Sequence, residues 1–98
     1  MKILWSETAL IRADDISNFI AEDSLKEAIK WLKQLFIEVD RFEIFPELGR
    51  LVPNFNDEYL REIIFGNYRI IYEVNNNAIE ILTIWHSRKP LNKENLKR

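Results

Sequence analysis

The sequence predicts an α+β fold in which a helical hairpin covers one face of a small antiparallel sheet. Three observations support this class. Apolar residues recur with helical period from residue 9 to residue 42. A segment with two prolines and one glycine then interrupts the pattern. Three runs rich in aromatic and β-branched residues come next, separated by turn residues. Helices followed by strands are typical of α+β folds, and the 98 residues indicate a single domain over residues 1–98.

The N-terminal segment predicts one strand and a first helix. Residues 2–5, KILW, are a short apolar run that we expect to join the sheet beside a neighbour that is not sequential. Ser6 is a candidate N-cap for a helix over residues 7–21. One face of that helix carries apolar residues at steps of four, three and four: Ala9, Ala13, Ile16 and Ile20.

The second helix is predicted to begin at a capping box formed by Ser24 and Glu27. Its apolar residues keep the helical period for over four turns, as far as Phe42. Because only a few residues separate the two helices, we expect them to lie antiparallel as a hairpin.

The C-terminal half predicts a three-stranded meander. The strand candidates are residues 59–65 (YLREIIF), 68–74 (YRIIYEV) and 78–85 (AIEILTIW). Gly66-Asn67 and the three asparagines at 75–77 are turn signals, since glycine and asparagine both tolerate positive φ. Residues 90–98 form a polar tail that we expect to hold a short helix opened by Pro90.

The asparagine turn sets the expected register of the last two strands. If Asn76 and Asn77 are its central residues, Asn75 pairs with Ala78, and Glu73 lies opposite Glu80. A slip of one residue would move every side chain to the other face.

Side-chain alternation then assigns the two faces of the sheet. Arg69 is expected opposite Ile84, on the same side as His86. The more apolar set should face the helices: Ile79, Ile81, Thr83 and Trp85. We therefore expect Arg69, His86 and Arg88 to converge on the sheet face that has no helices.

Composition and motifs exclude several kinds of site. The chain has no cysteine and one histidine, so neither a zinc site nor any other metal site is expected. It has two glycines and no Gly-rich phosphate loop, so we expect no nucleotide cofactor. The absence of cysteine fits a reducing compartment, and we expect a cytoplasmic protein. No 18-residue apolar run is present, so no membrane partner is expected.

The net charge of −2 is unevenly distributed. Residues 1–58 carry 7 Lys/Arg and 12 Asp/Glu, whereas residues 59–98 carry 7 and 4. This asymmetry is either ordinary surface variation or an acidic half beside a basic functional face. Since the chain as a whole is not strongly basic, we expect no sequence-specific DNA binding by this chain alone.

The remaining candidate site is a set of cations and one imidazole: Arg61, Arg69, His86, Arg88 and Lys89. Arginines and a histidine can hold a phosphate and move a proton, which permits metal-free RNA cleavage. Arginines can also dock on an acidic protein surface. A third reading is purely structural: Arg69 pairs with Glu73 or Glu80, and His86 merely ends a strand.

Four stretches of the chain carry a family resemblance: ILWSETAL, FPELGR, LREIIFGNYRIIYEV and IEILTIWHSRKPL. In this order and spacing the chain resembles the RelE/ParE superfamily of toxins from bacterial type II toxin–antitoxin modules, over roughly residues 1–91. The resemblance implies a microbial-RNase-like α+β fold and a cognate antitoxin that wraps the helices and sheet. RelE-like members cut mRNA in the ribosomal A site, whereas ParE-like members poison DNA gyrase.

The resemblance to the nuclease branch is partial. Nuclease members use an arginine in the YR-x-x-Y strand and another after the last strand, which Arg69 and Arg88 match. Some also use a histidine or a tyrosine near the C-terminus. However, the preceding strand reads Leu60-Arg61-Glu62 where RelE-type members carry lysines, and no aromatic residue comes after Pro90.

The sequences of the segments FPELGR, LRE and HSRKPL are more similar to the ParE branch. We therefore expect a ParE-like toxin that binds DNA gyrase through the exposed candidates Arg61, Arg69, His86, Arg88 and Lys89. The alternative is a RelE-like nuclease acting on the ribosome and mRNA. In that alternative, Arg69 and Arg88 hold the scissile phosphate, and His86 is the acid or base.

Overall fold

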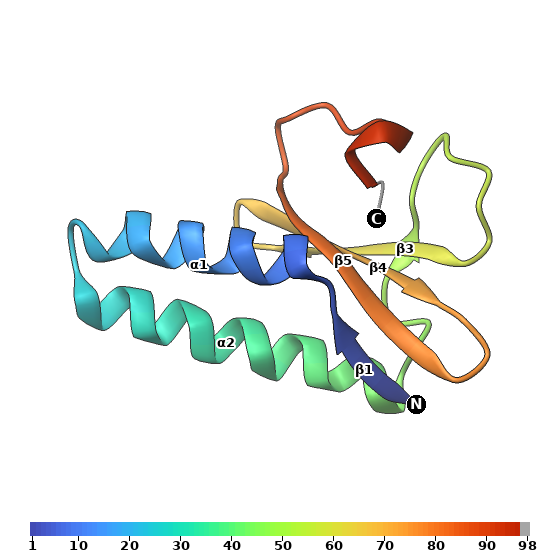
Figure 1. Cartoon of the computed structure of the whole chain (residues 1–98), viewed down its shortest axis with the longest axis horizontal. Coiled ribbons are helices and arrows are strands. Elements are labelled where there is room, and N and C mark those ends of the chain that lie inside the picture. The colour runs from blue at the N-terminus through green and yellow to red at the C-terminus, as the bar shows by residue number, and fades with distance from the viewer. Residues whose placement is uncertain (97–98) are drawn as a thin grey trace.

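The computed structural model describes residues 1–96 and has two layers, a helical hairpin and a five-stranded sheet (Figure 1). The sheet order is β1-β5-β4-β3-β2. In chain order the elements are β1 (Lys2–Trp5), α1 (Glu7–Ala21), α2 (Leu25–Ile44), β2 (Arg50–Leu51), β3 (Leu60–Phe65), β4 (Tyr68–Val74), β5 (Ala78–His86) and the 3₁₀-helix η1 (Lys93–Leu96). The predicted α+β class is confirmed.

Both helices begin at the predicted serine caps. Ser6 Oγ accepts from the N–H of Ala9 at 3.0 Å, and Ser24 Oγ accepts from the N–H of Glu27 at 3.2 Å. The backbone N–H of Ser24 donates to the carbonyl of Ile20 at 3.0 Å, at the end of α1. The N–H group of Ser24 is therefore bonded to the end of α1, and the connection between the two helices is short. The two helices run antiparallel, as predicted (Figure 1).

The predicted meander of β3, β4 and β5 is confirmed, and two further strands complete the sheet. β1 pairs in parallel with β5, so the N-terminal strand does lie beside a non-sequential neighbour. The short edge strand β2 pairs with β3 and was not predicted, because its two residues come after a loop rich in turn formers. Gly66 has φ +58 in the two-residue turn between β3 and β4, where a side chain would be strained.

Each face of the sheet buries its own apolar cluster. On the helix side, Ala9, Ala13, Leu35, Val39 and Phe42 pack on Ile70, Tyr72, Ile79, Ile81 and Ile84. The other face carries neither α1 nor α2, in agreement with the prediction, but other segments cover it. There, Val52, Phe55, Leu60, Ile71, Leu82 and Trp85 pack together, and Leu91 and Leu96 of the C-terminal segment lie against them. Figure 1 shows η1 and the loop before β3 beyond this face.

The predicted register holds near the asparagine turn and fails farther along β5. The N–H of Asn75 donates to the carbonyl of Ala78, and Glu73 pairs with Glu80, as expected. A register shift between Ile71 and Tyr72 then leaves one extra residue in β5. This is a β-bulge, which disrupts the pairing by one residue and changes the facing of the residues beyond it.

The bulge reverses the faces of the last four residues of β5, Thr83 to His86. Arg69 pairs with Trp85 rather than with Ile84. Ile84 packs in the helix-side cluster, and Trp85 packs in the other. The expected set of helix-facing residues is therefore correct for Ile79 and Ile81 but wrong for Thr83, which pairs with Ile71, and for Trp85.

The C-terminal segment contains a short helix, but it starts at Lys93 rather than at Pro90. Asn92 Oδ1 accepts from the N–H of Asn95 at 3.2 Å, which explains the later start. The end of the predicted tail, residues 97–98, lies outside the described residues. Within residues 1–96, neither α1 nor α2 combines the length and hydrophobicity that a membrane-spanning helix requires.

Candidate functional site

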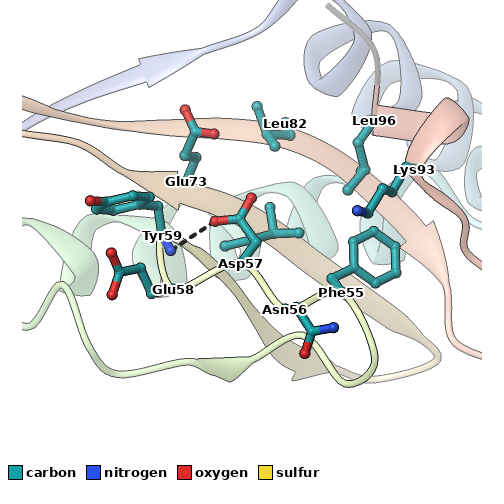
Figure 2. Close-up of a pocket in the computed structure, with 10 residues that line it drawn as sticks. Phe55, Asn56, Asp57, Glu58, Tyr59, Glu73, Leu82, Lys93 and Leu96 are labelled. Atoms are coloured by element: carbon teal, nitrogen blue, oxygen red, sulfur yellow. Dashed lines mark hydrogen bonds between the residues drawn. The ribbon is translucent and has the colours of Figure 1, made fainter.

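A pocket of about 570 Å³ lies between the loop before β3 and the C-terminal segment (Figure 2). Its apolar wall includes Leu60, Leu82 and Leu96, and the carboxylates of Asp57, Glu58 and Glu73 line it as well. A hydrogen bond to Glu58 and the charge of that carboxylate raise the pKa of Tyr59. Because the lining is largely acidic, this pocket is not suited to a phosphate. None of the residues predicted for the site lines it.

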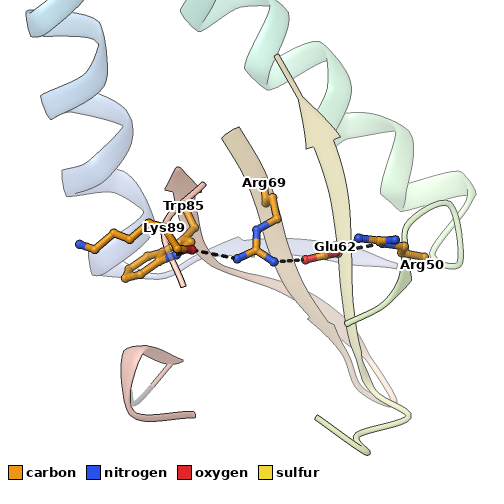
Figure 3. A network of polar contacts seen from close by, with 5 residues as sticks. All are labelled: Arg50, Glu62, Arg69, Trp85 and Lys89. Atoms are coloured by element: carbon orange, nitrogen blue, oxygen red, sulfur yellow. Dashed lines mark hydrogen bonds and ion pairs between the residues drawn. The ribbon is translucent and has the colours of Figure 1, made fainter. Parts of the chain in front are cut away.

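A buried ion-pair network occupies the same sheet face, centred on Glu62 of β3 (Figure 3). The Glu62 side chain is fully buried, and its two oxygens contact two arginines. Oε2 lies 2.7 Å from Nη2 of Arg50, and Oε1 lies 3.0 Å from Nη1 of Arg69. A buried carboxylate requires such partners because its desolvation is costly.

The structure makes Arg69 an internal residue. Its side chain is 15% exposed, and besides Glu62 it donates from Nη2 to the carbonyl of Lys89 at 3.4 Å. The same carbonyl accepts from Nε1 of Trp85 at 2.9 Å (Figure 3). The structural reading of Arg69 is therefore right that it pairs with a glutamate. The partner, however, is Glu62 rather than Glu73 or Glu80.

Arg61 lies on the helix side of the sheet, away from Arg69. It pairs across the strands with Tyr72, and its Nη1 donates to the carbonyl of Gly49 at 2.7 Å. Tyr72 Oη accepts from the N–H of Gly49 at 2.8 Å and donates to the carbonyl of Pro46 at 2.9 Å. Arg61 and Tyr72 thus hold residues 46–49, which we call the PELG loop, against the sheet.

The same loop explains two local properties. A Cβ on Gly49 would lie 2.6 Å from the carbonyl oxygen of Glu62, so only glycine fits there. Burial raises the pKa of Tyr72, although the hydrogen bond with Gly49 and the charge of Arg61 act in the opposite direction. Tyr72 therefore remains a neutral hydrogen-bond donor up to alkaline pH.

His86 lies on the helix side of the sheet, whereas Arg69 lies on the other face. The imidazole of His86 contacts the ring of Tyr68 edge-on at 5.5 Å between centroids, and Tyr68 in turn contacts Trp31 of α2. The expected convergence of Arg69, His86 and Arg88 is therefore wrong for the first two residues. The bulge in β5 is the physical reason, because it turns His86 to the face opposite to the predicted one.

Arg88 and Lys89 are exposed on a closed turn after β5. The N–H of Arg88 donates to Nδ1 of His86 at 3.2 Å, and the N–H of Lys89 donates to the carbonyl of His86 at 3.1 Å. The ammonium of Lys89 lies 4.6 Å from the centroid of the Trp85 ring. A residue outside the predicted set approaches the same ring, since Cζ of Arg12 in α1 lies at 4.7 Å.

Sequence reasoning missed four residues of this region: Arg12, Arg50, Glu62 and Trp85. Glu62 had a detectable signal, because alternation in β3 places it on the same face as Leu60, and a carboxylate in an apolar row requires a cation. Arg50 and Arg12 had none, since their contacts join elements far apart in the sequence. Trp85 was assigned to the wrong face. Among residues 1–96, no three His, Cys, Asp or Glu side chains gather as a metal site would require.

Comparisons with known proteins agree with this architecture. Residues 3–91 match the family model described as ParE toxin of type II toxin-antitoxin system, parDE. The fold is similar to that of a chain in the solved structure "Chromosomal ParDE TA system from P. aeruginosa", with a TM-score of 0.73 and 18% sequence identity. The match covers 88% of this chain and 95% of that chain, and at this identity it concerns the fold alone. The comparison with curated proteins finds no match.

The family model thus spans the chain from β1 to the segment after β5, which includes the Glu62 network and the turn with Arg88 and Lys89. From this match we conclude that the chain belongs to the ParE toxin family of type II toxin–antitoxin systems.

Proposed function

We propose that this toxin arrests growth in the cytoplasm by binding DNA gyrase and that a cognate antitoxin neutralises it. The separation of Arg69 from His86 is the observation that favours a binding mechanism over a cleavage mechanism. Metal-free RNA cleavage needs a phosphate-holding arginine and a proton-transferring group around one phosphate. Here Arg69 is tied to the buried Glu62, and His86 lies on the opposite face of the sheet.

Family membership supports the choice of gyrase, because gyrase is the target that the ParE branch implies. The alternative target is the ribosome with its mRNA, as in RelE-like nucleases. It is supported only by the exposed cations at the end of β5. Arg88 and Lys89 remain accessible there.

The experiment is a pair of assays on the purified protein. We expect it to inhibit plasmid supercoiling by gyrase at concentrations that leave mRNA intact on translating ribosomes. A heat-denatured sample serves as the control in both assays. Cleavage of mRNA in the A site, with supercoiling unaffected, would contradict the proposal and favour the nuclease.

The antitoxin proposal is supported by exposed apolar side chains on the helices. Leu25, Ile29 and Phe36 lie along one side of α2 at helical spacing, and they are 67%, 47% and 42% exposed. Leu10, Ile11 and Phe19 are similarly exposed on α1. Apolar side chains that gather on a protein surface mark protein–protein contact sites.

Coexpression with the product of a neighbouring antitoxin gene tests this part. We expect a stable complex that no longer arrests growth, and Ile29→Lys should weaken that complex. Ile64→Lys is the matched control, since Ile64 is 57% exposed but lies on β3 instead of on the helices. Equal weakening by both variants would argue against binding through α2.

A further inference from the structure

Six of the fourteen Lys/Arg residues of this protein fall into two groups. Arg50, Arg61 and Arg69 are each engaged with a buried carboxylate or a backbone carbonyl. Arg12, Arg88 and Lys89, by contrast, make no ion pair with any carboxylate in the part of the chain that the structure describes. The candidate docking cations therefore differ from the set that the sequence suggests, because Arg12 is added and Arg61 and Arg69 are removed.

Two of these three cations lie over one buried ring, and the third is on the same turn as one of them. Arg12 and Lys89 lie 4.7 and 4.6 Å from the centroid of the Trp85 ring, and Arg88 precedes Lys89 on the same turn. Trp85 is only 2% exposed, so it acts as a support rather than as a binding surface itself. We use the name Trp85 cation cluster for Arg12, Arg88 and Lys89.

The turn that carries Arg88 and Lys89 is held in place before any partner arrives. Trp85 Nε1 donates to the carbonyl of Lys89 at 2.9 Å, which fixes the turn against the ring. The N–H of Ser87 also donates to the carbonyl of Asn67 at 2.9 Å, which ties the turn to the β3–β4 connection. Binding groups that are already ordered lose less entropy on association. Contact with the ring face leaves the N–H groups of a guanidinium available to an anion.

We propose that the Trp85 cation cluster binds a compact group of carboxylates on the protein partner that this toxin attacks. The inference rests on the proposed function in one respect, namely that the target is a protein. Carboxylates match the donors present, since a guanidinium and an ammonium both donate to carboxylate oxygens.

The surroundings favour a compact acidic group over a nucleic-acid backbone. A duplex carries one charge for about every 1.7 Å of its axis, so it needs an extended basic track. The cluster has three cations, and Asp14 and Asp15 are exposed on α1 within one turn of Arg12. Residues 1–58 carry 7 Lys/Arg against 12 Asp/Glu. A long polyanion would therefore meet repulsion as soon as it left the cluster.

The first test is a titration of the ¹⁵N-labelled protein, monitored by NMR, with a hexaglutamate peptide. We expect chemical-shift changes at the Trp85 indole N–H and at the Lys89 backbone N–H, and these changes should weaken as salt is added. A hexaglutamine peptide is the uncharged control and should cause none. A duplex DNA that binds more tightly than hexaglutamate at equal salt would overturn the choice of carboxylates.

Two sets of variants test the assignment of residues. Lys89→Glu should weaken hexaglutamate binding by about tenfold, the effect expected of a reversed charge at a contact. Lys33→Glu is the matched control, because Lys33 is exposed on α2 and the substitution changes the net charge equally. The triple variant Arg12→Gln, Arg88→Gln and Lys89→Gln removes the cluster without adding a carboxylate. Its thermal unfolding shows whether it remains folded.

The gyrase assay separates this inference from the proposed function. If the wild-type toxin inhibits gyrase and the folded triple variant inhibits it equally, the cluster is not the contact, and the proposed function stands. If the wild-type toxin does not inhibit gyrase, the proposed function fails, and the titration still decides whether the cluster binds carboxylates. Equal binding of hexaglutamate by Lys89→Glu and Lys33→Glu would overturn the cluster in either case.

Discussion

Glu62 and Arg69 form a buried ion pair across neighbouring strands, with 3.0 Å between Oε1 and Nη1. Arg50 closes the pair from the other side, at 2.7 Å from Oε2. The Glu62 side chain has no exposed surface, whereas Arg50 is 65% exposed. The pair therefore joins β4 to β3 and β2 at the point where the C-terminal segment crosses Arg69.

Glu62→Gln should lower the free energy of unfolding by about 3–5 kcal/mol, the usual cost of removing one partner of a buried pair. The substitution keeps the shape of the side chain but leaves the guanidinium of Arg69 without its counter-charge. Urea denaturation measures the change. Glu38→Gln is the control, since its pair with Arg41 lies on the surface of α2 and should contribute at most about 1 kcal/mol. Similar losses in the two variants would contradict a structural role for Glu62.

Tyr72→Phe should destabilise the fold by about 1–3 kcal/mol, because the N–H of buried Gly49 loses its acceptor. The stacking of Tyr72 on Phe42, at 4.1 Å between centroids, does not need the hydroxyl. Thermal unfolding measures the effect. Tyr59→Phe removes an exposed hydroxyl and should leave the stability unchanged. If the Tyr72→Phe variant were as stable as wild type, the hydroxyl of Tyr72 would not be what holds the PELG loop.

The raised pKa of Tyr72 gives a second, independent prediction at alkaline pH. Burial raises this pKa above its ordinary value of 10.0, so the folded protein keeps the phenolic proton longer than the unfolded chain does. The resulting stabilisation is complete below pH 10 and is lost as the pH rises through the folded-state pKa. The free energy of unfolding should fall more steeply above pH 10 in wild type than in Tyr72→Phe. Parallel curves would show that Tyr72 does not contribute to the alkaline loss.

His86→Ala should retain growth arrest if the toxin acts by binding. The imidazole is exposed, and it lies on the face of the sheet opposite to Arg69. Its removal takes away an acceptor for the N–H of Arg88 and little else. Induction of the variant in cells, with its expression level measured, checks this expectation. Loss of growth arrest in a folded, normally expressed variant would instead favour imidazole catalysis.

Trp85→Phe should loosen the C-terminal segment. Phenylalanine keeps a ring beneath Arg12 and Lys89 but has no N–H to donate to the carbonyl of Lys89. One hydrogen bond contributes about 1 kcal/mol, so amide exchange at Lys89 and Asn95 should rise several-fold. Trp31→Phe provides the comparison, because the Trp31 ring packs on Phe65 and Tyr68 on the helix side. Faster exchange that is equal in both variants would indicate general destabilisation.

Most elements of the fold can be predicted from local patterns. Apolar periodicity and serine caps located the start of α1 and of α2, and alternation with turn residues located the meander. Local interactions also set the asparagine turn, where the side chain of Asn75 accepts from the N–H of Ala78 at 3.0 Å. β2 was not predicted, because a strand of two residues is too short to show an alternating pattern of apolar and polar residues.

The candidate site was harder to predict than the fold, because faces and partners depend on distant segments. Strict alternation places His86 beside Arg69, but a single extra residue in β5 sends them to opposite faces. No local signal marks that bulge. It is decided by packing, which puts Ile84 against the helices and Trp85 against the C-terminal segment.

The sequence by itself determined that this chain has a helical hairpin, a meander and a set of cations toward its C-terminus. Only the tertiary structure decided which of those cations are free. Glu62 is buried, and its desolvation demands Arg50 and Arg69 as partners. Trp85 instead gathers Arg12 and Lys89 from opposite ends of the chain. Charge pairing in a folded protein acts through space, whereas sequence patterns report only neighbours along the chain.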